Sequence, residues 1–335
     1  MPEAVEVRKF ADILSDNILG KNITHINILK GRYTKKVFEG YDELIKALPL
    51  TIEAINTKGK FTYMTLVNKN KHKQFYLFNT LGLSGGWTLK SNKKTNFAKC
   101  KHCHYMEKDN HLFTYPGILE YITQNNQNDW FQKALNHLNV EFITDYKNIS
   151  FYFYDQLSFG TLKAVGGSSS LILEKKLKEL GPDLLDETTT FKLFKTQLRK
   201  KLNETKPIGN VIVNQKIVSG VGNYLRADAL WMAKISPFRK VKDVKEDELE
   251  LLYKSLLSLI WGDYDYEKGV KKGYVTNSNI NSNSNTDTLK LPNDYKRDFF
   301  IYRQEKDIYN HKVKKEELFE GSQKRFIYWV EQIQK

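Results

Sequence analysis

Apolar residues at the start of the chain recur at helical spacing. Val7, Phe10, Leu14 and Ile18 lie three or four positions apart, and this spacing places side chains on one face of an α-helix. The pattern predicts an amphipathic helix over residues 2–18. A helix that begins at the second residue would hold the chain end in one place.

The pattern changes beyond this helix. From about residue 24 to 161 there are short runs rich in β-branched and aromatic residues, separated by polar turns, such as residues 61–66, 75–78 and 151–154. Such runs are typical of antiparallel strands. We expect this half of the chain to form an antiparallel β-sandwich or barrel.

Helical periodicity returns after the glycine- and serine-rich residues 166–170. It covers four segments, residues 171–180, 190–202, 223–233 and 246–261. The second half is therefore predicted to be helical, and the fold class to be α+β.

The last part of the chain contains a low-complexity stretch and two apolar runs. Residues 276–288 are mostly Asn, Ser and Thr, a composition that cannot bury a core. Residues 299–302 and 326–329 look like two strands of a terminal hairpin. The predicted organisation is a β-rich domain, a helical domain, a disordered or lid-like connector and a hairpin, at residues 1–165, 166–275, 276–297 and 298–335.

The composition favours a polyanionic partner. The chain has 53 Lys and Arg residues against 39 Asp and Glu residues, a formal net charge of +14, and such a field attracts phosphate backbones. Only eight of the basic residues are Arg, so a lysine-rich, AT-biased coding sequence is an alternative explanation.

Other features bear on compartment and assembly. Two cysteines cannot make a disulfide framework, the chain start carries no apolar signal segment, and no apolar run is long enough to span a membrane. We therefore expect a protein of a reducing compartment, in the nucleus or in a cytoplasmic compartment that contains DNA, with no membrane association. We also expect it to be a monomer.

Pro2 and Glu3 offer candidate chemistry. Removal of the initiator Met1 would leave Pro2 with a secondary amine, and a terminal amine with an ordinary pKa near 8 is partly unprotonated at neutral pH. Such an amine can attack a sugar C1′ to form an iminium, with the Glu3 carboxylate beside it to move protons. The alternative is structural, since Pro and Glu both favour a helix start.

A second candidate site lies where a glycine turn enters a predicted helix. Gly220, Val221 and Gly222 precede Asn223, and free backbone N–H groups at such a turn suit an anion such as a phosphate. A turn between two helices without any ligand would look the same.

Together these segments carry a resemblance to the formamidopyrimidine-DNA glycosylase and endonuclease VIII family. The chain start, residues 2–8, is similar to the first residues of that family. Residues 220–226 (Gly-Val-Gly-Asn-Tyr-Leu-Arg) resemble its helix-two-turn-helix signature, in the form that is closest to the endonuclease VIII branch. Four further matches follow in the family's order, at residues 58–61, 81–85, 180–183 and 325–329. The resemblance spans nearly the whole chain.

The resemblance implies a bifunctional DNA glycosylase and AP lyase of base excision repair, which nicks DNA by β,δ-elimination. Pro2 would be the nucleophile, Glu3 would assist proton transfers, and Lys60 would contact the phosphate near the lesion. The implied substrates are oxidised pyrimidines, formamidopyrimidines and hydantoins in double-stranded DNA, or in single-stranded or bubble DNA. No cofactor is implied.

The resemblance also implies a set of DNA contacts. Asn223 and Arg325 would hold the phosphates that flank a flipped nucleotide, Lys216 matches another DNA-contacting lysine, and Glu6 matches a glutamate near the lesion. Leu83 and Phe159 match apolar wedge positions. A lone lysine such as Lys216 could equally be a solvated surface charge.

The chain departs from the family in two places. The positions that align with the four zinc-binding cysteines of bacterial members are Ile308, His311, Val330 and Ile333, which cannot provide the four donors of a tetrahedral zinc site. We therefore expect no metal, and a zincless finger held by apolar packing.

The second departure concerns the loop that fills the gap left by the flipped base. Two family arginines in this loop are replaced by Leu157 and Ser158. Their loss is expected to relax discrimination of the opposite base, or to favour unpaired substrates.

Three alternatives stay open. The first concerns Cys100 and Cys103, which lie in a Cys-x-x-Cys-His pattern that is typical of haem attachment. With His111 they could instead form a small zinc site. An insertion loop with incidental cysteines explains the same residues. The protein could be an AP lyase only. It could also be a non-catalytic paralogue that binds damaged DNA.

Overall fold

The computed structural model describes residues 2–68, 70, 72–92, 103–108, 111–116, 133–146, 149–167, 169–264, 299–320 and 323–335. The chain forms two compact units. The first contains Pro2 with Glu6–Lys178, and the second contains Glu3–Val5 with Glu179–Lys335. Each unit is described by itself below.

The first unit is mostly β-sheet. Its elements are α1 (Ala4–Ile18), β1 (Asn22–Ile28), η1 (Gly31–Thr34), α2 (Tyr41–Lys46), β2 (Leu50–Lys58), β3 (Phe61–Asn68), β4 (Lys73–Thr80), β5 (Gly85–Asn92), β6 (Cys103–Lys108), β7 (His111–Pro116), β8 (Leu138–Thr144), β9 (Ser150–Asp155), β10 (Thr161–Gly166) and α4 (Ser170–Lys178).

The first helix confirms the prediction from periodicity, with a start two residues later than expected. α1 begins at Ala4, so Pro2 and Glu3 precede it. The side chains of Val7, Phe10 and Leu14 are buried in the core of the first unit. Helical spacing thus places one apolar face of α1 against the sheet, and this burial is what holds the helix in position.

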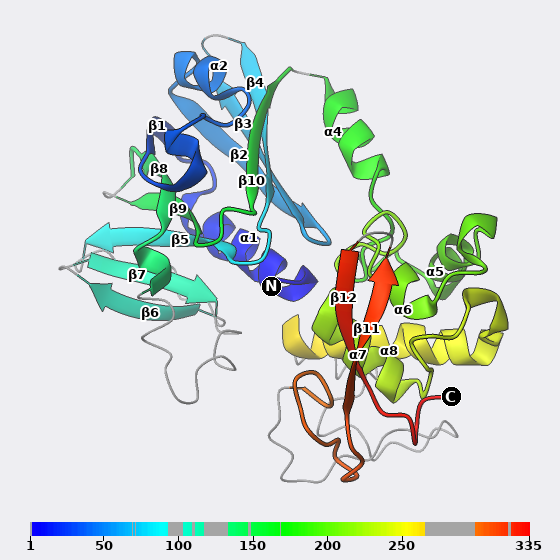
Figure 1. Cartoon of the computed structure of the whole chain (residues 1–335). Helices are drawn as coiled ribbons and strands as arrows, with labels where there is room; N and C mark the ends of the chain where they lie inside the picture. The colour runs from blue at the N-terminus through cyan, green and yellow to red at the C-terminus, as the bar shows by residue number, and fades with distance from the viewer. Residues whose placement is uncertain are drawn as a thin grey trace. The chain divides into compact units, whose positions relative to one another are not determined.

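The strands form one antiparallel sheet of ten strands in the order β10-β4-β3-β2-β1-β8-β9-β5-β7-β6. In Figure 1 the strands β2, β3, β4 and β10 run across the direction of β5, β6 and β7. Residues from both halves of the sheet share one apolar core. At its centre the Trp87 ring contacts the rings of Phe142, Phe151 and Phe153 at centroid distances of 5.4–5.9 Å. The antiparallel, two-layered arrangement agrees with the prediction.

The second unit is mostly helical. Its elements are α5 (Phe191–Leu198), η3 (Lys201–Asn203), α6 (Ile208–Val211), α7 (Asn223–Met232), η4 (Val241–Asp243), α8 (Glu246–Tyr264) and a hairpin of β11 (Lys314–Glu320) and β12 (Gln323–Trp329). Every residue of α7 after Asn223 is buried. α7 is therefore the central helix of this unit.

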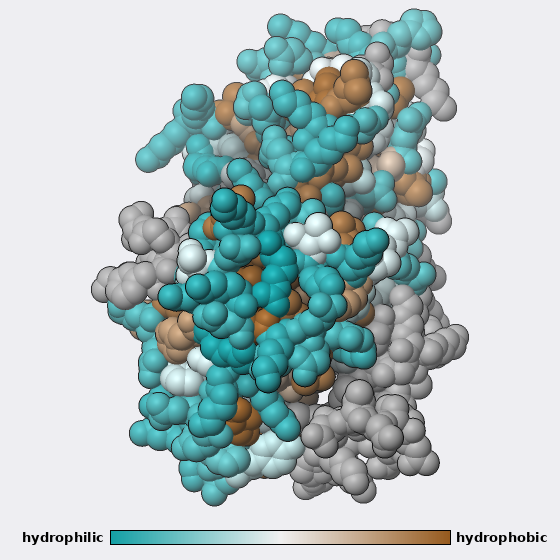
Figure 2. Space-filling model, turned by 90° about the vertical axis from the view of Figure 1, so that its right-hand side faces the viewer, coloured by the Kyte–Doolittle hydropathy of each residue, from teal (hydrophilic) through white to brown (hydrophobic). Residues whose placement is uncertain are grey.

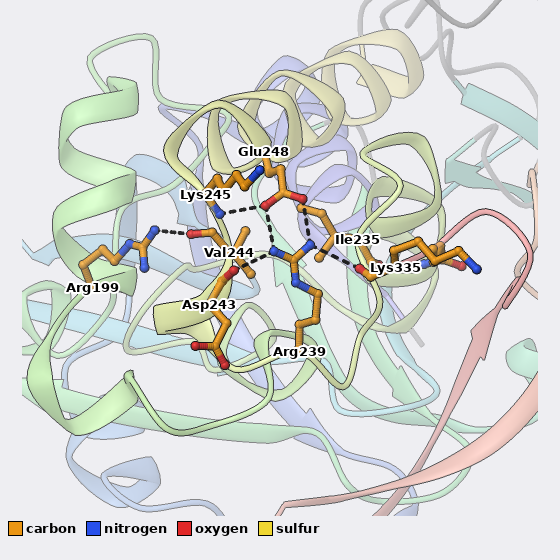
Figure 3. A network of polar contacts seen from close by, with 9 residues as sticks. Arg199, Ile235, Arg239, Asp243, Val244, Lys245, Glu248 and Lys335 are labelled. Atoms are coloured by element: carbon orange, nitrogen blue, oxygen red, sulfur yellow. Dashed lines mark hydrogen bonds and ion pairs between the residues drawn. The ribbon is translucent and has the colours of Figure 1, made fainter.

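A polar network braces the end of α5 and the start of α8 (Figure 3). The Arg239 guanidinium donates two hydrogen bonds of 2.7 Å to the two carboxylate oxygens of Glu248. It also donates to the carbonyls of Asp243 and Lys335, and Arg199 donates to the carbonyls of Val241 and Val244. The bidentate pair raises the pKa of Arg239 and lowers that of Glu248, so both groups stay charged at neutral pH.

One of the two predicted hairpin strands is wrong. Residues 299–302 form a bend and turn, whereas β11 lies at Lys314–Glu320. The backbone N–H groups of Phe300, Ile301 and Tyr302 all donate to the buried carboxylate of Asp228, at 3.0 Å each. These bonds replace a strand partner, because N–H groups that converge on one carboxylate cannot point along a ladder. The apolar side chains of the segment instead pack on α7, where Phe300 stacks on Trp231.

The hairpin is held by apolar packing. Val313, Leu318, Ile327 and Val330 belong to a buried cluster with Trp231, Phe300 and Ile301, and Ile308 and Ile333 pack against it. Three of the four positions that align with the family's zinc ligands therefore lie in or against this cluster. The fourth, His311, has its Nδ1 3.1 Å from the carboxylate of Asp307.

Two sequence predictions are not tested by these elements. The connector at residues 276–297 lies outside the described residues. The boundaries proposed at residues 165/166 and 275/276 stay predictions.

The described residues include no helix that is long and apolar enough to cross a bilayer. The face of the molecule in Figure 2 is predominantly hydrophilic, with apolar atoms in small separate areas. Large apolar side chains that are exposed elsewhere are therefore of interest as contact sites.

Candidate active site and nucleic-acid interface

The Glu3 carboxylate lies at the N-terminus of α7. One of its oxygens accepts hydrogen bonds from the N–H groups of Gly222 at 2.7 Å and Leu225 at 3.4 Å, and the other accepts from the N–H of Tyr224 at 3.0 Å. The side chain is 1% exposed. Backbone donors at a helix N-terminus suit a carboxyl group, so these bonds hold the Glu3 side chain in a fixed position.

A second bond fixes the same stretch of chain. The N–H of Ala4 donates to the carbonyl of Gly220 at 3.1 Å. Pro2 is half-buried and is joined to Glu3 by a peptide bond. The nitrogen of Pro2 is therefore kept within one residue of an anchored carboxylate.

The turn before α7 is shaped by Gln215, which the sequence reasoning missed. Its amide oxygen accepts from the N–H of Gly220 at 2.8 Å, and its amide nitrogen donates to the carbonyls of Val213 and Val221. Gly220 has a φ of 99°, a conformation that favours glycine. The glycine spacing was a signal for this turn, but no local pattern distinguishes Gln215 from a surface glutamine.

Asn223 is the first residue of α7 and is partly exposed. Its amide oxygen accepts a hydrogen bond of 3.1 Å from the buried guanidinium of Arg226. The same guanidinium donates to the carbonyl of Phe326 at 2.8 Å and to the carbonyl of Gly209 at 3.3 Å. Arg226 was part of the recognised motif, yet its position between α6, α7 and β12 could not be read from sequence.

The other predicted phosphate contacts of the second unit lie on the turn and on the hairpin. Lys216 is exposed, one residue after Gln215. Arg325 lies in β12, where it pairs with Leu318 and precedes Phe326. Asn223 and the backbone beside Arg325 are thus linked through Arg226.

The remaining predicted catalytic positions lie in the first unit. Lys60 is half-buried in the two-residue turn between β2 and β3, whose flanking residues Lys58 and Phe61 pair. Glu6 is half-buried in the first turn of α1. Their roles stay predictions.

Two loops of the first unit bring the predicted wedge residues together. Leu83 lies in the turn between β4 and β5, and Phe159 lies in the loop between β9 and β10. The loops touch at Gly82, where a Cβ atom would come within 2.7 Å of the backbone of Gly160. Glycine at this position lets the loops approach closely.

Asp155 braces both loops. Its carboxylate, in a side chain that is 2% exposed, accepts hydrogen bonds from the Ser84 hydroxyl at 2.5 Å, the Leu157 N–H at 3.2 Å and the Gly160 N–H at 2.6 Å. The Leu157 N–H also donates to the Ser84 hydroxyl at 2.9 Å. A buried carboxylate with these donors holds the loop backbone rigidly.

The braced loops expose three large apolar side chains. Leu83 is 47% exposed, Leu157 is 52% exposed and Phe159 is 59% exposed. Rigid backbone under exposed apolar side chains is the arrangement of a contact surface rather than of a core. Leu157 stands where the family resemblance leads one to expect arginine.

The alternative in which His111 completes a small zinc site with the cysteines is wrong, because His111 lies too far from Cys103. Cys103 begins β6 and pairs with Pro116, whereas His111 begins β7 and pairs with Lys108. Cys103 and His111 therefore lie at opposite ends of one hairpin, roughly 16 Å apart for five residues of strand. Cys100 lies outside the described residues.

No group of three or more His, Cys, Asp or Glu residues that could hold a metal is found among the described side chains. The backbone N–H groups that the glycine turn was predicted to offer to a phosphate are bonded within the protein instead. That of Gly220 donates to Gln215, and those of Gly222, Tyr224 and Leu225 donate to Glu3. The backbone part of the predicted phosphate site is therefore wrong, and the Asn223 side chain stays the candidate phosphate contact. A fixed carboxylate beside the chain start suits a positively charged intermediate.

Comparison with known proteins gives consistent matches along the chain. Three models of the formamidopyrimidine-DNA glycosylase family match in succession: its N-terminal domain at residues 1–162, its helix-two-turn-helix domain at residues 180–271 and its C-terminal domain at residues 289–335.

Individual relatives carry the same name. The formamidopyrimidine-DNA glycosylase of Lactococcus lactis subsp. lactis is 26% identical over 275 residues, which cover 82% of this chain and 79% of the relative. That of Zymomonas mobilis is 25% identical over 261 residues, which cover 78% and 77%.

Solved structures agree in fold. A structure of MutM in complex with DNA containing carbocyclic 8-oxo-G has a TM-score of 0.65 at 21% identity, and a complex between Lactococcus lactis Fpg and DNA containing an abasic site has a TM-score of 0.64 at 20% identity; each match covers 99% of both chains. With three successive domain models of one family matched at residues 1–162, 180–271 and 289–335, the chain belongs to the formamidopyrimidine-DNA glycosylase family of DNA repair enzymes.

Proposed function

We propose that the protein is a bifunctional DNA glycosylase and AP lyase that uses the Pro2 amine as nucleophile. The observation that carries this proposal is the anchoring of Glu3 by three N–H groups at the start of α7. A chain start that served only to begin a helix would not require a buried carboxylate fixed to a segment more than 200 residues away. An amine that must meet one sugar carbon requires a fixed position.

The proposed reaction begins when the lone pair of the Pro2 nitrogen attacks C1′ of the damaged nucleotide. The bond from C1′ to the base breaks, and the base leaves with its electron pair and takes up a proton. The sugar ring then opens as O4′ is protonated, which leaves an iminium between Pro2 and C1′. The Glu3 carboxylate, one residue away, stabilises this positive charge and assists the proton transfers.

Strand cleavage follows from the same iminium. Loss of a C2′ proton expels the 3′ phosphate, and a second elimination expels the 5′ phosphate. Water then hydrolyses the iminium and returns the free amine. No redox partner is needed, because each elimination moves an electron pair within the substrate.

We infer DNA contacts from the surfaces described above. Asn223, Arg325 and Lys216 would bind phosphates, and Lys60 would bind the phosphate nearest the lesion. Leu83 and Phe159 would enter the base stack when the nucleotide is flipped out, as apolar wedges do. The solved neighbours in complex with DNA containing 8-oxo-G or an abasic site support DNA as the partner.

We infer the substrate specificity from sequence features that differ within the family. The motif at residues 223–226 has the form found in the endonuclease VIII branch, which favours oxidised pyrimidines, formamidopyrimidines and hydantoins as substrates. Leu157 carries no hydrogen-bond donor with which to read the opposite base, which predicts weak dependence on that base. The apolar cluster around Ile308, Val330 and Ile333 supports a zincless finger.

Borohydride trapping tests the nucleophile. The mature protein is incubated with oligonucleotides that contain an abasic site or thymine glycol, and borohydride reduces the iminium to a stable cross-link. A Pro2→Gly variant and a form with a blocked terminal amine are run in parallel. Lys60→Ala is compared with Lys58→Ala, whose lysine Nζ donates to the Leu177 carbonyl and is not expected to touch the substrate.

We expect trapping on both substrates, lost in the blocked form and reduced in Lys60→Ala but not in Lys58→Ala. Trapping on the abasic site alone would leave an AP lyase without base removal. DNA binding with no trapping on either substrate would favour the non-catalytic alternative and refute the proposed chemistry.

A further inference from the structure

Arg226 joins two of the three predicted phosphate contacts of the second unit, Asn223 and Arg325. Its guanidinium is fully buried and donates to the Asn223 amide oxygen at the start of α7 and to the carbonyl of Phe326 in β12. A third bond reaches the carbonyl of Gly209 in α6. Arg325, the predicted contact on the hairpin, directly precedes Phe326 in the chain.

The bond to Asn223 determines which way its amide points. A guanidinium has only donors, so the Asn223 atom 3.1 Å from it is the carbonyl oxygen. The amide nitrogen lies on the other side of the same carbon and is turned away from Arg226. Asn223 therefore presents an NH₂ group, which suits a phosphate oxygen and repels a donor.

The position of Arg226 is unfavourable for stability on two counts. It is the fourth residue of α7, close to the helix N-terminus, where the helix dipole disfavours a cation. Burial of a charged group also costs free energy unless hydrogen bonds compensate it. A planar fork that reaches three elements at once is a property of arginine that lysine does not share.

We propose that Arg226 is a positioning residue for DNA binding, which orients the Asn223 amide toward a backbone phosphate and holds the hairpin at Arg325 in register with it. This inference rests on the proposed function, because it requires that DNA binds at Asn223. Arg226 itself does not touch the DNA. It acts through the groups that it holds.

A double-mutant cycle on DNA affinity tests the coupling. The variants Asn223→Ala, Arg226→Lys and the double variant are titrated with a duplex that contains a tetrahydrofuran abasic-site analogue, a ligand that is bound but not cleaved by β-elimination. Arg199→Lys is the matched control, because Arg199 also donates to backbone carbonyls of the second unit but lies in the network of Figure 3 rather than beside Asn223.

We expect each single variant to raise the Kd about 10-fold, the scale of one lost hydrogen bond to a charged group. The double variant is expected to bind no more than about threefold more weakly than Asn223→Ala alone, since Arg226 acts largely through Asn223 and only this remainder comes from its hold on the hairpin at Arg325. Arg199→Lys is expected to leave the Kd within twofold. Multiplied effects of about 100-fold in the double variant would overturn the proposal.

A second variant avoids any change to the buried cation. Asn223→Asp keeps an oxygen for Arg226 and replaces the outward NH₂ by a second oxygen with negative charge. The variant is expected to unfold at no lower temperature than the wild type, and to bind the duplex more weakly than Asn223→Ala does. Wild-type affinity in Asn223→Asp would show that the amide is not oriented as inferred and would overturn the proposal.

These titrations are independent of catalysis. If borohydride trapping fails while the cycle shows coupling, the proposed chemistry is wrong and the positioning role of Arg226 stands. If the wild-type protein does not bind the duplex, both proposals fall.

Discussion

Replacement of Asp155 should destabilise the first unit because this carboxylate satisfies buried donors in two loops. In Asp155→Ala, the Gly160 N–H loses its partner at 2.6 Å and the Ser84 hydroxyl loses its acceptor at 2.5 Å. A buried donor left unpaired costs about 1–3 kcal/mol and a lost hydrogen bond to a charged group costs about 1.5–3 kcal/mol. Because the two estimates partly count the same bond, we expect a total of about 3 kcal/mol.

Asp155→Asn should be milder. An amide oriented with its oxygen toward Gly160 keeps that bond, and its nitrogen can donate to the Ser84 hydroxyl, which still accepts from the Leu157 N–H. We expect a loss of about 1 kcal/mol, the size of one weakened hydrogen bond. For a unit of this size, each 1 kcal/mol lowers Tm by roughly 2–4 °C, so the two variants should differ by several degrees.

Thermal and urea unfolding of the variants measure this effect, with Asp145→Ala as the control. Asp145 accepts two hydrogen bonds from Asn22 but lies at an exposed site, so its loss is expected to cost less than about 1 kcal/mol. The order of stability should be wild type, Asp155→Asn and then Asp155→Ala. If Asp155→Ala costs no more than Asp145→Ala, the brace is not the energetic feature that its geometry indicates.

Three further predictions concern Asp228, the wedge residues and Lys216. Burial raises the pKa of Asp228 from 3.8 to about 7 despite three N–H bonds, so its carboxyl group binds a proton more tightly in the folded state. The folding stability that this proton adds is fully present below pH 4 and is lost as the pH rises to 7. Between pH 4 and pH 8, the free energy of unfolding of the wild type, measured in urea, should therefore fall by up to about 4 kcal/mol relative to that of Asp228→Asn. A difference between the two proteins that does not change with pH would contradict this. Leu83→Ala and Phe159→Ala should slow excision from duplex DNA at least 10-fold with Tm changed by less than about 2 °C, because half-exposed side chains contribute little to folding; equal slowing on single-stranded DNA would argue against a wedge role. Lys216→Ala should weaken binding of all duplexes alike and reduce the slope of log K against log salt by about 0.9, whereas an unchanged slope would make Lys216 a solvated surface charge.

The elements in which apolar residues recur with a regular spacing could be predicted from the sequence. The apolar face of α1, the strands at residues 61–66 and 151–154, and helix α8 follow from spacing alone, because their burial repeats with the geometry of the element. The motif around Asn223 was also visible, since its glycines are needed at a tight turn. These features depend on neighbours in sequence.

The parts that could not be predicted depend on partners far away in the chain. Residues 299–302 have the composition of a strand, but Asp228 takes their N–H groups, and no local pattern indicates that. β11 was missed because Lys and Glu fill most of its positions, which an exposed two-stranded hairpin tolerates. The brace at Asp155 and the reach of Arg226 are likewise long-range contacts.

The anchoring of Glu3 has a consequence for protein synthesis. Its partner Gly222 lies 219 residues further along the chain, and at 5–20 residues per second the ribosome needs roughly 10–45 s to make that stretch. During this interval the strands of the first unit can pair while the chain start has no helix N-terminus to hold it. The proposed nucleophile, Pro2, would therefore be available to processing enzymes throughout, and the chain start would be set in place only after most of the chain has been made.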